Sequence, residues 1–265
     1  MGSLTGKVAV VTGASRGVGK GVAEGLGEAG ATVYITGRSE SHESPPADRT
    51  IQATAARVDE LGGKGIAVKL DHNDDAAVEA LFARVREEQG RLDVLVNNVY
   101  KIPNPPAWGG GFWEHPLSVW DDQCGVGLRG YYVASVFGAP LMVEQRAGLI
   151  VNISSSGAGG YTFSASYGVC KSGVDRMARD FAVELKDYNV AALSLWPAAV
   201  KTEFIKDSVA AGAVEFDLDA AESPHFVGRC VAALATDPNI MDRTGGVYQV
   251  AELSEAYGFT DPDKD

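Results

Sequence analysis

The chain has 265 residues, of which 45% are hydrophobic and 22% are charged, and these fractions are typical of a globular protein rather than a disordered one. Its 23 basic and 35 acidic side chains give a net charge of −12, which disfavours non-specific binding to nucleic acid or to an anionic membrane. The cysteines Cys124, Cys170 and Cys230 are far apart and odd in number, so we expect a reducing compartment and no disulfide scaffold.

The first residues lead directly into an apolar strand pattern, without the length or layout of a signal peptide. No apolar stretch approaches the roughly 18 residues that a membrane-spanning helix needs. The four histidines lie in separate segments without the spacing of metal ligands. We therefore expect a cytoplasmic protein with no metal site and no membrane or nucleic-acid partner.

Apolar runs alternate with helical patterns along the whole chain. In chain order, the first half predicts a strand at 7–12, a helix ending near Gly30, a strand at 32–36, a polar loop at 39–49, a helix ending at Gly62-Gly63, a strand at 64–70, a helix at 74–89 and a strand at 94–97. The second half predicts a loop at 101–116, a helix at about 117–145, a strand at 149–155, a helix at 165–188, a strand at 190–196, an irregular or weakly helical segment at 201–221, a helix at 224–235 and a strand at 246–250.

Strands that alternate with helices form right-handed βαβ units and a parallel sheet that helices cover on both faces. The sequence has no linker, repeat or low-complexity tract. We therefore predict an α/β protein with one doubly wound domain over residues 1–265. Its sheet is expected to have seven strands and to be mainly parallel.

The first motif with chemical meaning is TGASRGVG at 12–19, between a predicted strand and a predicted helix. Gly13 allows the tight turn, while Gly17 and Gly19 let the backbone approach a pyrophosphate and let the helix pack close to the sheet. The helix N-terminus adds free N–H groups and partial positive charge. A glycine-rich turn by itself could be a simple chain reversal, so the strand–helix context carries the prediction of a dinucleotide site.

The end of the second predicted strand indicates which dinucleotide is bound. An acidic residue there would bind the ribose hydroxyl of NAD, whereas an arginine accommodates the additional phosphate of NADP. This sequence has Gly37 and Arg38 at that place, and Arg16 lies within the glycine-rich turn. The two arginines could be ordinary surface residues, but their positions favour NADP(H) over NAD(H).

Tyr167 and Lys171 are four residues apart on a predicted helix, so they share one helix face. An ammonium beside a phenol favours the phenolate form, which prepares a tyrosine for proton transfer. A lone pair at this spacing is usually ordinary helix surface. Here three serines, 154–156, end the preceding strand, and a serine hydroxyl at the end of such a strand could hold a carbonyl oxygen.

These motifs and their order resemble the short-chain dehydrogenase/reductase family over essentially the whole chain, and within it the chain is most similar to the dehydrogenase/reductase member 1 branch. The matching motifs are T-G-x-x-x-G-x-G at 12–19, Asn97-Asn98, I-S-S at 153–155, Y-x-x-x-K at 167–171 and Pro197. The resemblance implies a Rossmann-type fold, a small-molecule carbonyl or alcohol substrate of apolar character, and a homo-oligomer, either dimer or tetramer. It also implies a set of cofactor-binding residues: Gly13, Ser15, Arg16, Gly17, Val18, Gly19, Arg38, Asp71, His72, Asn97, Tyr167, Lys171, Pro197, Val200 and Thr202.

Two serines compete for the catalytic position that the family implies. Counting thirteen residues back from Tyr167, as is usual in the family, gives Ser154. The register of the I-S-S strand instead gives Ser155. A deletion in a loop is tolerated more easily than a slip in a central strand, because a slip turns every side chain to the other face. We therefore expect Ser155 to be catalytic, with Ser154 as the second candidate.

Some positions depart from the family pattern. Tyr100 stands where the family's N-N-A-G motif ends in glycine, and Gly127 replaces the asparagine that completes a catalytic tetrad. In related enzymes that asparagine is thought to bind a water that links the lysine to solvent. Three arrangements are possible at Gly127: the helix is kinked, another group holds the water, or the link between the lysine and solvent is absent. We expect the second: a water fills the gap and bonds the helix backbone and Lys171, so Gly127→Asn leaves turnover unchanged or raises it.

The sequence thus predicts an NADP(H)-dependent oxidoreductase that reduces a carbonyl, or oxidises the matching alcohol, by hydride transfer with Tyr167 as general acid/base. The alternative is a catalytically weak NADP(H)-binding sensor or interaction protein, which the missing asparagine keeps open. The segments 101–116 and 201–221 are expected to be substrate loops. Trp108, Phe112 and Trp113 in the first of them either pack on one another or line an apolar substrate pocket.

Overall fold

The strands and helices of the computed structural model, which describes residues 3–40 and 46–264, follow the predicted order. Part of the predicted loop 39–49 lies outside the described residues. The strands are β1 (Val8–Val11), β2 (Thr32–Gly37), β3 (Lys64–Lys69), β4 (Val94–Asn97), β5 (Gly148–Ile153), β6 (Val190–Trp196) and β7 (Val247–Gln249). The α-helices are α1 (Gly17–Glu28), α2 (Ile51–Glu60), α3 (Asp75–Gln89), α4 (Ser118–Trp120), α5 (Gly130–Gln145), α6 (Ala165–Leu185), α7 (Glu203–Ala210), α8 (Pro224–Thr236) and α9 (Val250–Tyr257).

The chain divides into two compact units. Unit 1 comprises Met1–Lys69, Pro197–Pro238 and Gln249–Asp265, and unit 2 comprises Leu70–Trp196 and Asn239–Tyr248. The strand order of the seven-stranded sheet is β3-β2-β1-β4-β5-β6-β7, which is the order of a doubly wound α/β sheet with one further strand. The predicted fold class is therefore confirmed, whereas the single domain over residues 1–265 stays a prediction.

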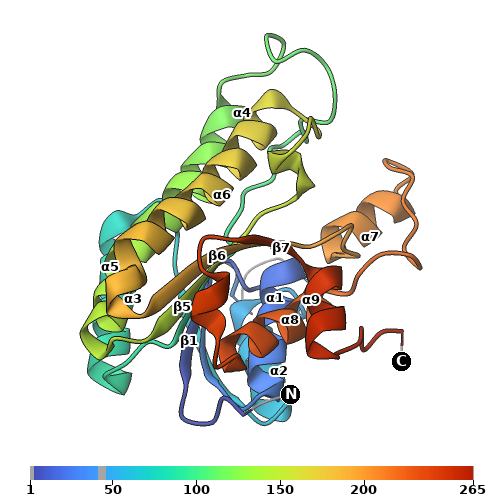
Figure 1. The fold of residues 1–265 in the computed structure, drawn as a ribbon. Helices are drawn as coiled ribbons and strands as arrows, with labels where there is room; N and C mark the ends of the chain where they lie inside the picture. The colour runs from blue at the N-terminus through green and yellow to red at the C-terminus, as the bar shows by residue number, and fades with distance from the viewer. Residues whose placement is uncertain (1–2, 41–45, 265) are drawn as a thin grey trace. The chain divides into compact units, whose positions relative to one another are not determined.

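In unit 1, the parallel pairing of β1 with β2 aligns Val8 with Thr32, and β2 pairs with β3 in the same sense. Every residue of β1 is buried, as in the strands of other parallel sheets. Helices α1 and α8 pack side by side (Figure 1). A Cβ added at Gly21 would lie 2.0 Å from the carbonyl carbon of Pro224, so glycine allows the backbones of these two helices to touch.

In unit 2, β4 pairs in parallel with β5, and β5 pairs in parallel with β6. Helices α5 and α6 run side by side (Figure 1) and both contact β5. The buried side-chain amide of Asn97, the last residue of β4, donates hydrogen bonds to Oδ1 of Asn152 at 2.9 Å and to Oγ of Ser135 at 3.0 Å. These bonds tie β4 to β5 and α5, so the strand ends that carry the candidate site are held together.

The predicted helix 117–145 is a continuous helical run, but part of it is not an α-helix. The segment Asp121–Arg129 between α4 and α5 is π-helical, and the N–H of Gly130 donates to the carbonyl of Gly125, five residues earlier. Short π-helical segments are frequent at functional sites. Contrary to our expectation, the run Ser118–Gln145 is long and apolar enough to cross a membrane by length and composition. However, 56% of its apolar window is buried in the protein, and buried core helices pass the same test.

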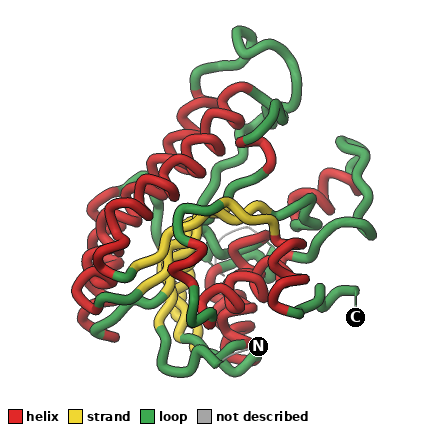
Figure 2. The backbone as a smooth tube through the Cα atoms, in the orientation of Figure 1, coloured by secondary structure: helices red, strands yellow, loops and turns green. Residues whose placement is uncertain are grey.

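The two segments that we expect to be substrate loops, 101–116 and 201–221, differ in their regularity. The loop at 101–116 is irregular, as predicted, and Figure 2 shows it in green, projecting beyond the start of α4. The segment 201–221, predicted to be irregular or weakly helical, contains the short helix α7. The sequence does not predict α9, because its two buried side chains, Val250 and Leu253, are too few to establish a helical period.

Candidate active site

The hydroxyl groups of Ser155 and Tyr167 share a hydrogen bond of 2.8 Å in unit 2. Ser155 follows β5 and caps a short 3₁₀ turn, where its Oγ accepts a hydrogen bond from the N–H of Gly157 at 3.2 Å. Tyr167 lies in the first turn of α6, and its N–H donates to Oγ of the capping residue Ser164 at 3.3 Å. A side-chain cap on each element therefore fixes the two hydroxyl groups relative to one another.

The two serines named by the sequence have different surroundings. Ser154 is buried, and its Oγ donates to the backbone carbonyl of Lys171 at 3.3 Å. Only Ser155 contacts the Tyr167 hydroxyl. Gly157 makes room for this contact, because a Cβ added there would lie 2.5 Å from Cε1 of Tyr167. The sequence offers no sign of this steric role, since the glycine lies ten residues before the ring that it accommodates.

The ammonium of Lys171 lies beside this pair although the residue is only 6% exposed. Its Nζ donates to the carbonyl oxygen of Ile153 at 3.1 Å. It also lies 5.2 Å from the centre of the Tyr100 ring and 5.9 Å from the centre of the Tyr167 ring. A buried ammonium requires compensation for the water it loses, and here one carbonyl and two aromatic rings provide it.

Aromatic side chains continue from Tyr167 toward the loop at 101–116. The ring of Phe163 meets Tyr167 at a near-perpendicular angle with centroids 5.2 Å apart, and Trp108 lies 6.2 Å from Phe163. Phe163 has a φ of +62°, an unusual conformation for a bulky residue. By contrast, Phe112 and Trp113 are 70% and 76% exposed and pack on each other. Of the three loop aromatics named by the sequence, Trp108 therefore joins the cluster around Tyr167, whereas the other two face solvent.

The space beside Gly127 is occupied by the ring of Tyr100. A Cβ added at Gly127 would lie 2.7 Å from Cδ2 of Tyr100 and 3.4 Å from Sγ of Cys170. Our expectation of a gap that admits a water is therefore wrong, and an asparagine at 127 would collide with the ring. Tyr100 and Gly127 each depart from the family pattern, but their contact across 27 positions of the sequence becomes visible only in the fold.

In unit 1, the glycine-rich turn binds a side-chain carboxylate of the protein itself. Gly13 and Gly17 have φ values of +67° and +58°, which L side chains rarely adopt. The N–H of Gly17, the first residue of α1, donates to Oε2 of Glu203 at 2.7 Å. Thr202, which precedes it, caps α7 by accepting from the N–H of Ile205. A carboxylate at this helix N-terminus shows that the residues present fit an anionic group such as a pyrophosphate.

Further residues predicted for the cofactor lie around this turn and the end of β2. A Cβ added at Gly37 would lie 3.6 Å from Cβ of Ser15 and 3.0 Å from Cγ2 of Ile51, so a larger side chain at 37 has little room. Arg16 and Arg38 are both exposed. Val18 and Gly19 belong to the first turn of α1. The position of these groups is compatible with a phosphate site, and their contacts with a cofactor stay predictions.

Three further residues that the family resemblance implies for cofactor binding, Asp71, His72 and Asn97, differ in exposure. Asp71 is exposed and accepts a hydrogen bond from the N–H of Asn73 at 3.0 Å. His72 is 3% exposed. Burial lowers its pKa to about 4, although the negative charge of Asp71 acts to raise it. Asn97 has its amide bonded within unit 2, as described above. Their roles, like those of Pro197 and Val200 in unit 1, stay predictions.

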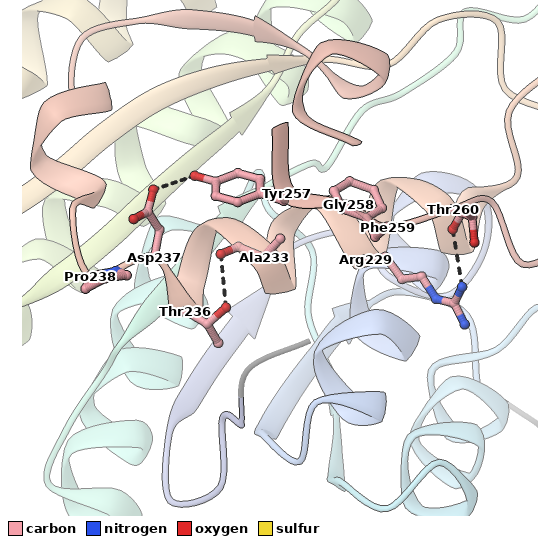
Figure 3. A pocket seen from close by; sticks show the side chains of 9 residues that line it. All are labelled: Arg229, Ala233, Thr236, Asp237, Pro238, Tyr257, Gly258, Phe259 and Thr260. Carbon is pink, nitrogen blue, oxygen red and sulfur yellow. Dashed lines mark hydrogen bonds between the residues drawn. The ribbon is translucent and has the colours of Figure 1, made fainter. Parts of the chain in front are cut away.

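A depression of about 460 Å³ lies in unit 1 beside α8 and α9 (Figure 3). Its polar side chains are engaged with protein groups. The Tyr257 hydroxyl donates to Oδ2 of Asp237 at 2.5 Å, and Arg229 donates to the carbonyl of Thr260 at 3.2 Å and to the carboxylate of Glu28 at 2.9 Å. We therefore assign the candidate active site to the Ser155–Tyr167 cluster.

The chain is similar to known proteins over most of its length. Residues 7–212 match the short chain dehydrogenase family. The chain is 45% identical over 274 residues to dehydrogenase/reductase SDR family member 1 of Mus musculus, and equally to that of Homo sapiens, over 98% of this chain and 84% of each relative. It is 30% identical to a 3-oxoacyl-[acyl-carrier-protein] reductase of Synechocystis over 94% of this chain and 97% of that protein.

A solved short chain dehydrogenase from Mycobacterium thermoresistibile has a similar fold. The two share a TM-score of 0.82 and 26% identity over 98% of this chain and 90% of the other. Together, the family match and the full-length relatives confirm the resemblance inferred from the motifs. The chain belongs to the short-chain dehydrogenase/reductase family of oxidoreductases.

Proposed function

We propose that this oxidoreductase uses NADP(H) to reduce a small-molecule carbonyl compound or to oxidise the matching alcohol. The observation that carries the proposal is the hydrogen bond of 2.8 Å between Ser155 and Tyr167, with the ammonium of Lys171 one helical turn away. A hydroxyl that can position an oxygen, a phenol that can transfer a proton and a cation that stabilises the phenolate are the groups that carbonyl reduction requires.

When bound, the reduced nicotinamide supplies the hydride. Tyr167 donates its hydroxyl proton to the substrate oxygen, and Ser155 donates a second hydrogen bond that keeps this oxygen within reach. Lys171 stabilises the phenolate that remains on Tyr167. In alcohol oxidation, the same phenolate accepts the proton of the substrate hydroxyl. Ser154, whose hydroxyl bonds to the backbone of Lys171, holds α6 against the end of β5.

The preference for NADP(H) over NAD(H) is proposed from the charges around the end of β2. Gly37 offers no carboxylate to bind a ribose hydroxyl or to repel a phosphate, and Arg16 and Arg38 are exposed cations in the same unit. A guanidinium forms charge-assisted hydrogen bonds with phosphate oxygens. These groups therefore favour the cofactor that carries the additional phosphate.

The substrate is proposed to be an apolar carbonyl compound, because Phe163 and Trp108 extend an aromatic surface from Tyr167. One relative is named as a 3-oxoacyl-[acyl-carrier-protein] reductase, and such a substrate carries a ketone. From the sequence and the family resemblance, we also propose a cytoplasmic homo-oligomer, dimer or tetramer, without nucleic-acid or membrane partners.

The proposal is tested by following NADPH oxidation with a panel of aliphatic, aromatic and polycyclic aldehydes and ketones, with NADH in parallel. We expect turnover of at least one apolar carbonyl, and faster turnover with NADPH than with NADH at subsaturating cofactor. Tight NADPH binding without turnover in either direction on the whole panel would contradict the enzyme and favour the alternative, a cofactor sensor.

A further inference from the structure

Two departures from the family pattern form one contact. Tyr100 follows β4, and Gly127 lies in the π-helical segment Asp121–Arg129. Carbons Cδ2 and Cε2 of the Tyr100 ring would lie 2.7 Å and 3.3 Å from a Cβ added at Gly127. Real Cβ atoms essentially never approach within 3.0 Å of a ring carbon, so the ring occupies its place only because residue 127 is glycine.

The ring of Tyr100 packs against the ring of Tyr167. Its plane is nearly perpendicular to the ring of Tyr167, at 89°, with centroids 6.1 Å apart. Burial raises the pKa of Tyr100 well above its ordinary value, so the side chain is a neutral phenol at physiological pH.

One face of this ring is turned to the charge of Lys171. Nζ lies 5.2 Å from the centre of the Tyr100 ring, nearer than to the Tyr167 ring at 5.9 Å. Within about 6 Å, the negative face of an aromatic ring attracts an ammonium, and the attraction strengthens when water is excluded. Among the described residues, Lys171 forms no ion pair with a carboxylate. The ring and the Ile153 carbonyl are therefore its main fixed partners besides Tyr167.

We propose that Tyr100 is a positioning residue that holds the ammonium of Lys171 beside Tyr167 through the face of its ring, in the space that Gly127 leaves free. This inference rests on the proposed function insofar as Lys171 assists Tyr167. Where the family resemblance implies an asparagine, Gly127 instead leaves room for the ring of Tyr100, which contacts Lys171.

The test varies the charge on the ring face while keeping its shape. Tyr100 is replaced by phenylalanine and, in a second protein, by 3,4,5-trifluorophenylalanine, whose ring face no longer attracts cations. Both proteins are also made with Lys171→Met, which removes the ammonium but keeps an unbranched side chain of similar length. Urea unfolding without any cofactor is measured for all four proteins. Phe163, which also contacts Tyr167, serves as the control position. There the parent phenylalanine is compared with 3,4,5-trifluorophenylalanine.

With Lys171 present, we expect fluorination at position 100 to lower the folding equilibrium constant about 3- to 30-fold. With Lys171→Met the difference should vanish, and fluorination at 163 should have the same effect in both backgrounds. A fluorination effect at position 100 that is equal with and without the ammonium would overturn the proposal, because it would show that the ring acts by packing alone.

Turnover of the same proteins separates this proposal from the proposed function. With a carbonyl substrate and NADPH, the fluorinated ring at position 100 should lower kcat relative to phenylalanine at the same position, with little change in KM. If the unfolding cycle shows the coupling but the parent reduces no carbonyl, the ring–ammonium contact stands and the proposed function fails. If the parent turns over normally but neither kcat nor unfolding responds to fluorination, the positioning role of Tyr100 is wrong.

Discussion

The N–H of Gly17 and the carboxylate of Glu203, which are 186 residues apart in the sequence, are joined by a hydrogen bond of 2.7 Å. The same N–H lies at the N-terminus of α1, where the family resemblance places the pyrophosphate of the cofactor. A pyrophosphate bound at this N-terminus would compete with Glu203 for the N–H of Gly17. We therefore predict that the carboxylate of Glu203 opposes cofactor binding.

We therefore expect Glu203→Gln to tighten NADPH binding. A hydrogen bond to a charged group contributes about 1.5 to 3 kcal/mol. The neutral amide of glutamine forms a weaker bond with the N–H of Gly17, and it does not repel a phosphate. The dissociation constant measured by calorimetry should fall about three- to tenfold. Glu215→Gln, at an exposed position in the same unit, makes the same change in net charge and should have little effect. Weaker binding to Glu203→Gln would show that this carboxylate assists the cofactor instead.

The contact between Tyr100 and Gly127 predicts that even a methyl group at 127 is harmful. Alanine is favoured over glycine in a helix by about 1 kcal/mol, but overpacking a filled site typically costs about 1 to 3 kcal/mol. We expect Gly127→Ala to be net destabilising in urea unfolding and to lower turnover. The double variant Tyr100→Ala/Gly127→Ala should lose less stability than the sum of the two single variants. Simple additivity would mean that the two side chains do not share the space.

Burial of His72 predicts an acid-sensitive contribution to stability. Its pKa is lowered in the folded protein to about 4, below its unfolded value, so the unfolded chain binds a proton that the folded chain does not. Stability from this residue is therefore complete above about pH 6.5 and is lost as the pH falls toward 4. Between pH 7 and 4.5 the parent should lose about 2 to 3 kcal/mol more than His72→Gln. Equal losses in urea unfolding would place His72 in a solvated site.

Arg38 is expected to select between the two cofactors. Arg38→Ala should weaken NADPH binding about tenfold or more, because a charge-assisted bond to phosphate contributes about 1.5 to 3 kcal/mol. NADH binding should change less than twofold, since it has no additional phosphate. Arg57→Ala on α2, which removes a different exposed arginine of unit 1, is the matched control. If Arg38→Ala weakens the binding of NADPH and NADH equally, this arginine does not contact the additional phosphate.

Local patterns in the sequence were sufficient for the sheet and for the parts of the site that follow from motifs. The strand predicted at 94–97 is β4. Ser155, Tyr167 and Lys171 come from one continuous stretch of the chain, in which the segment 154–164 connects the end of β5 to the start of α6. Such predictions succeed because apolar runs and helical spacing depend on neighbours in the chain. The doubly wound order then follows from the chirality of βαβ connections.

Contacts between distant segments could not be predicted in this way. The apolar pattern of 117–145 is that of a helix, but it does not encode the shift to π-helical bonding at Asp121–Arg129. Tyr100 and Glu203 gain their roles from what the fold places beside them, namely Gly127 and Gly17. The sequence marked Tyr100 and Gly127 as two separate departures from a pattern. Volume complementarity between them is a property of the packed structure.

The proposed chemistry depends most directly on the proton of Tyr167. Phenylalanine at this position keeps the ring that packs against Tyr100 and Phe163 but removes the transferable proton and the bond to Ser155. The decisive measurement is the rate of NADPH oxidation at saturating carbonyl substrate for the parent and for Tyr167→Phe, with NADPH affinity measured on the same samples. We expect affinity within about twofold of the parent and turnover lower by about 10²- to 10⁴-fold. Turnover at the parent rate with intact binding would contradict the role of Tyr167 as general acid.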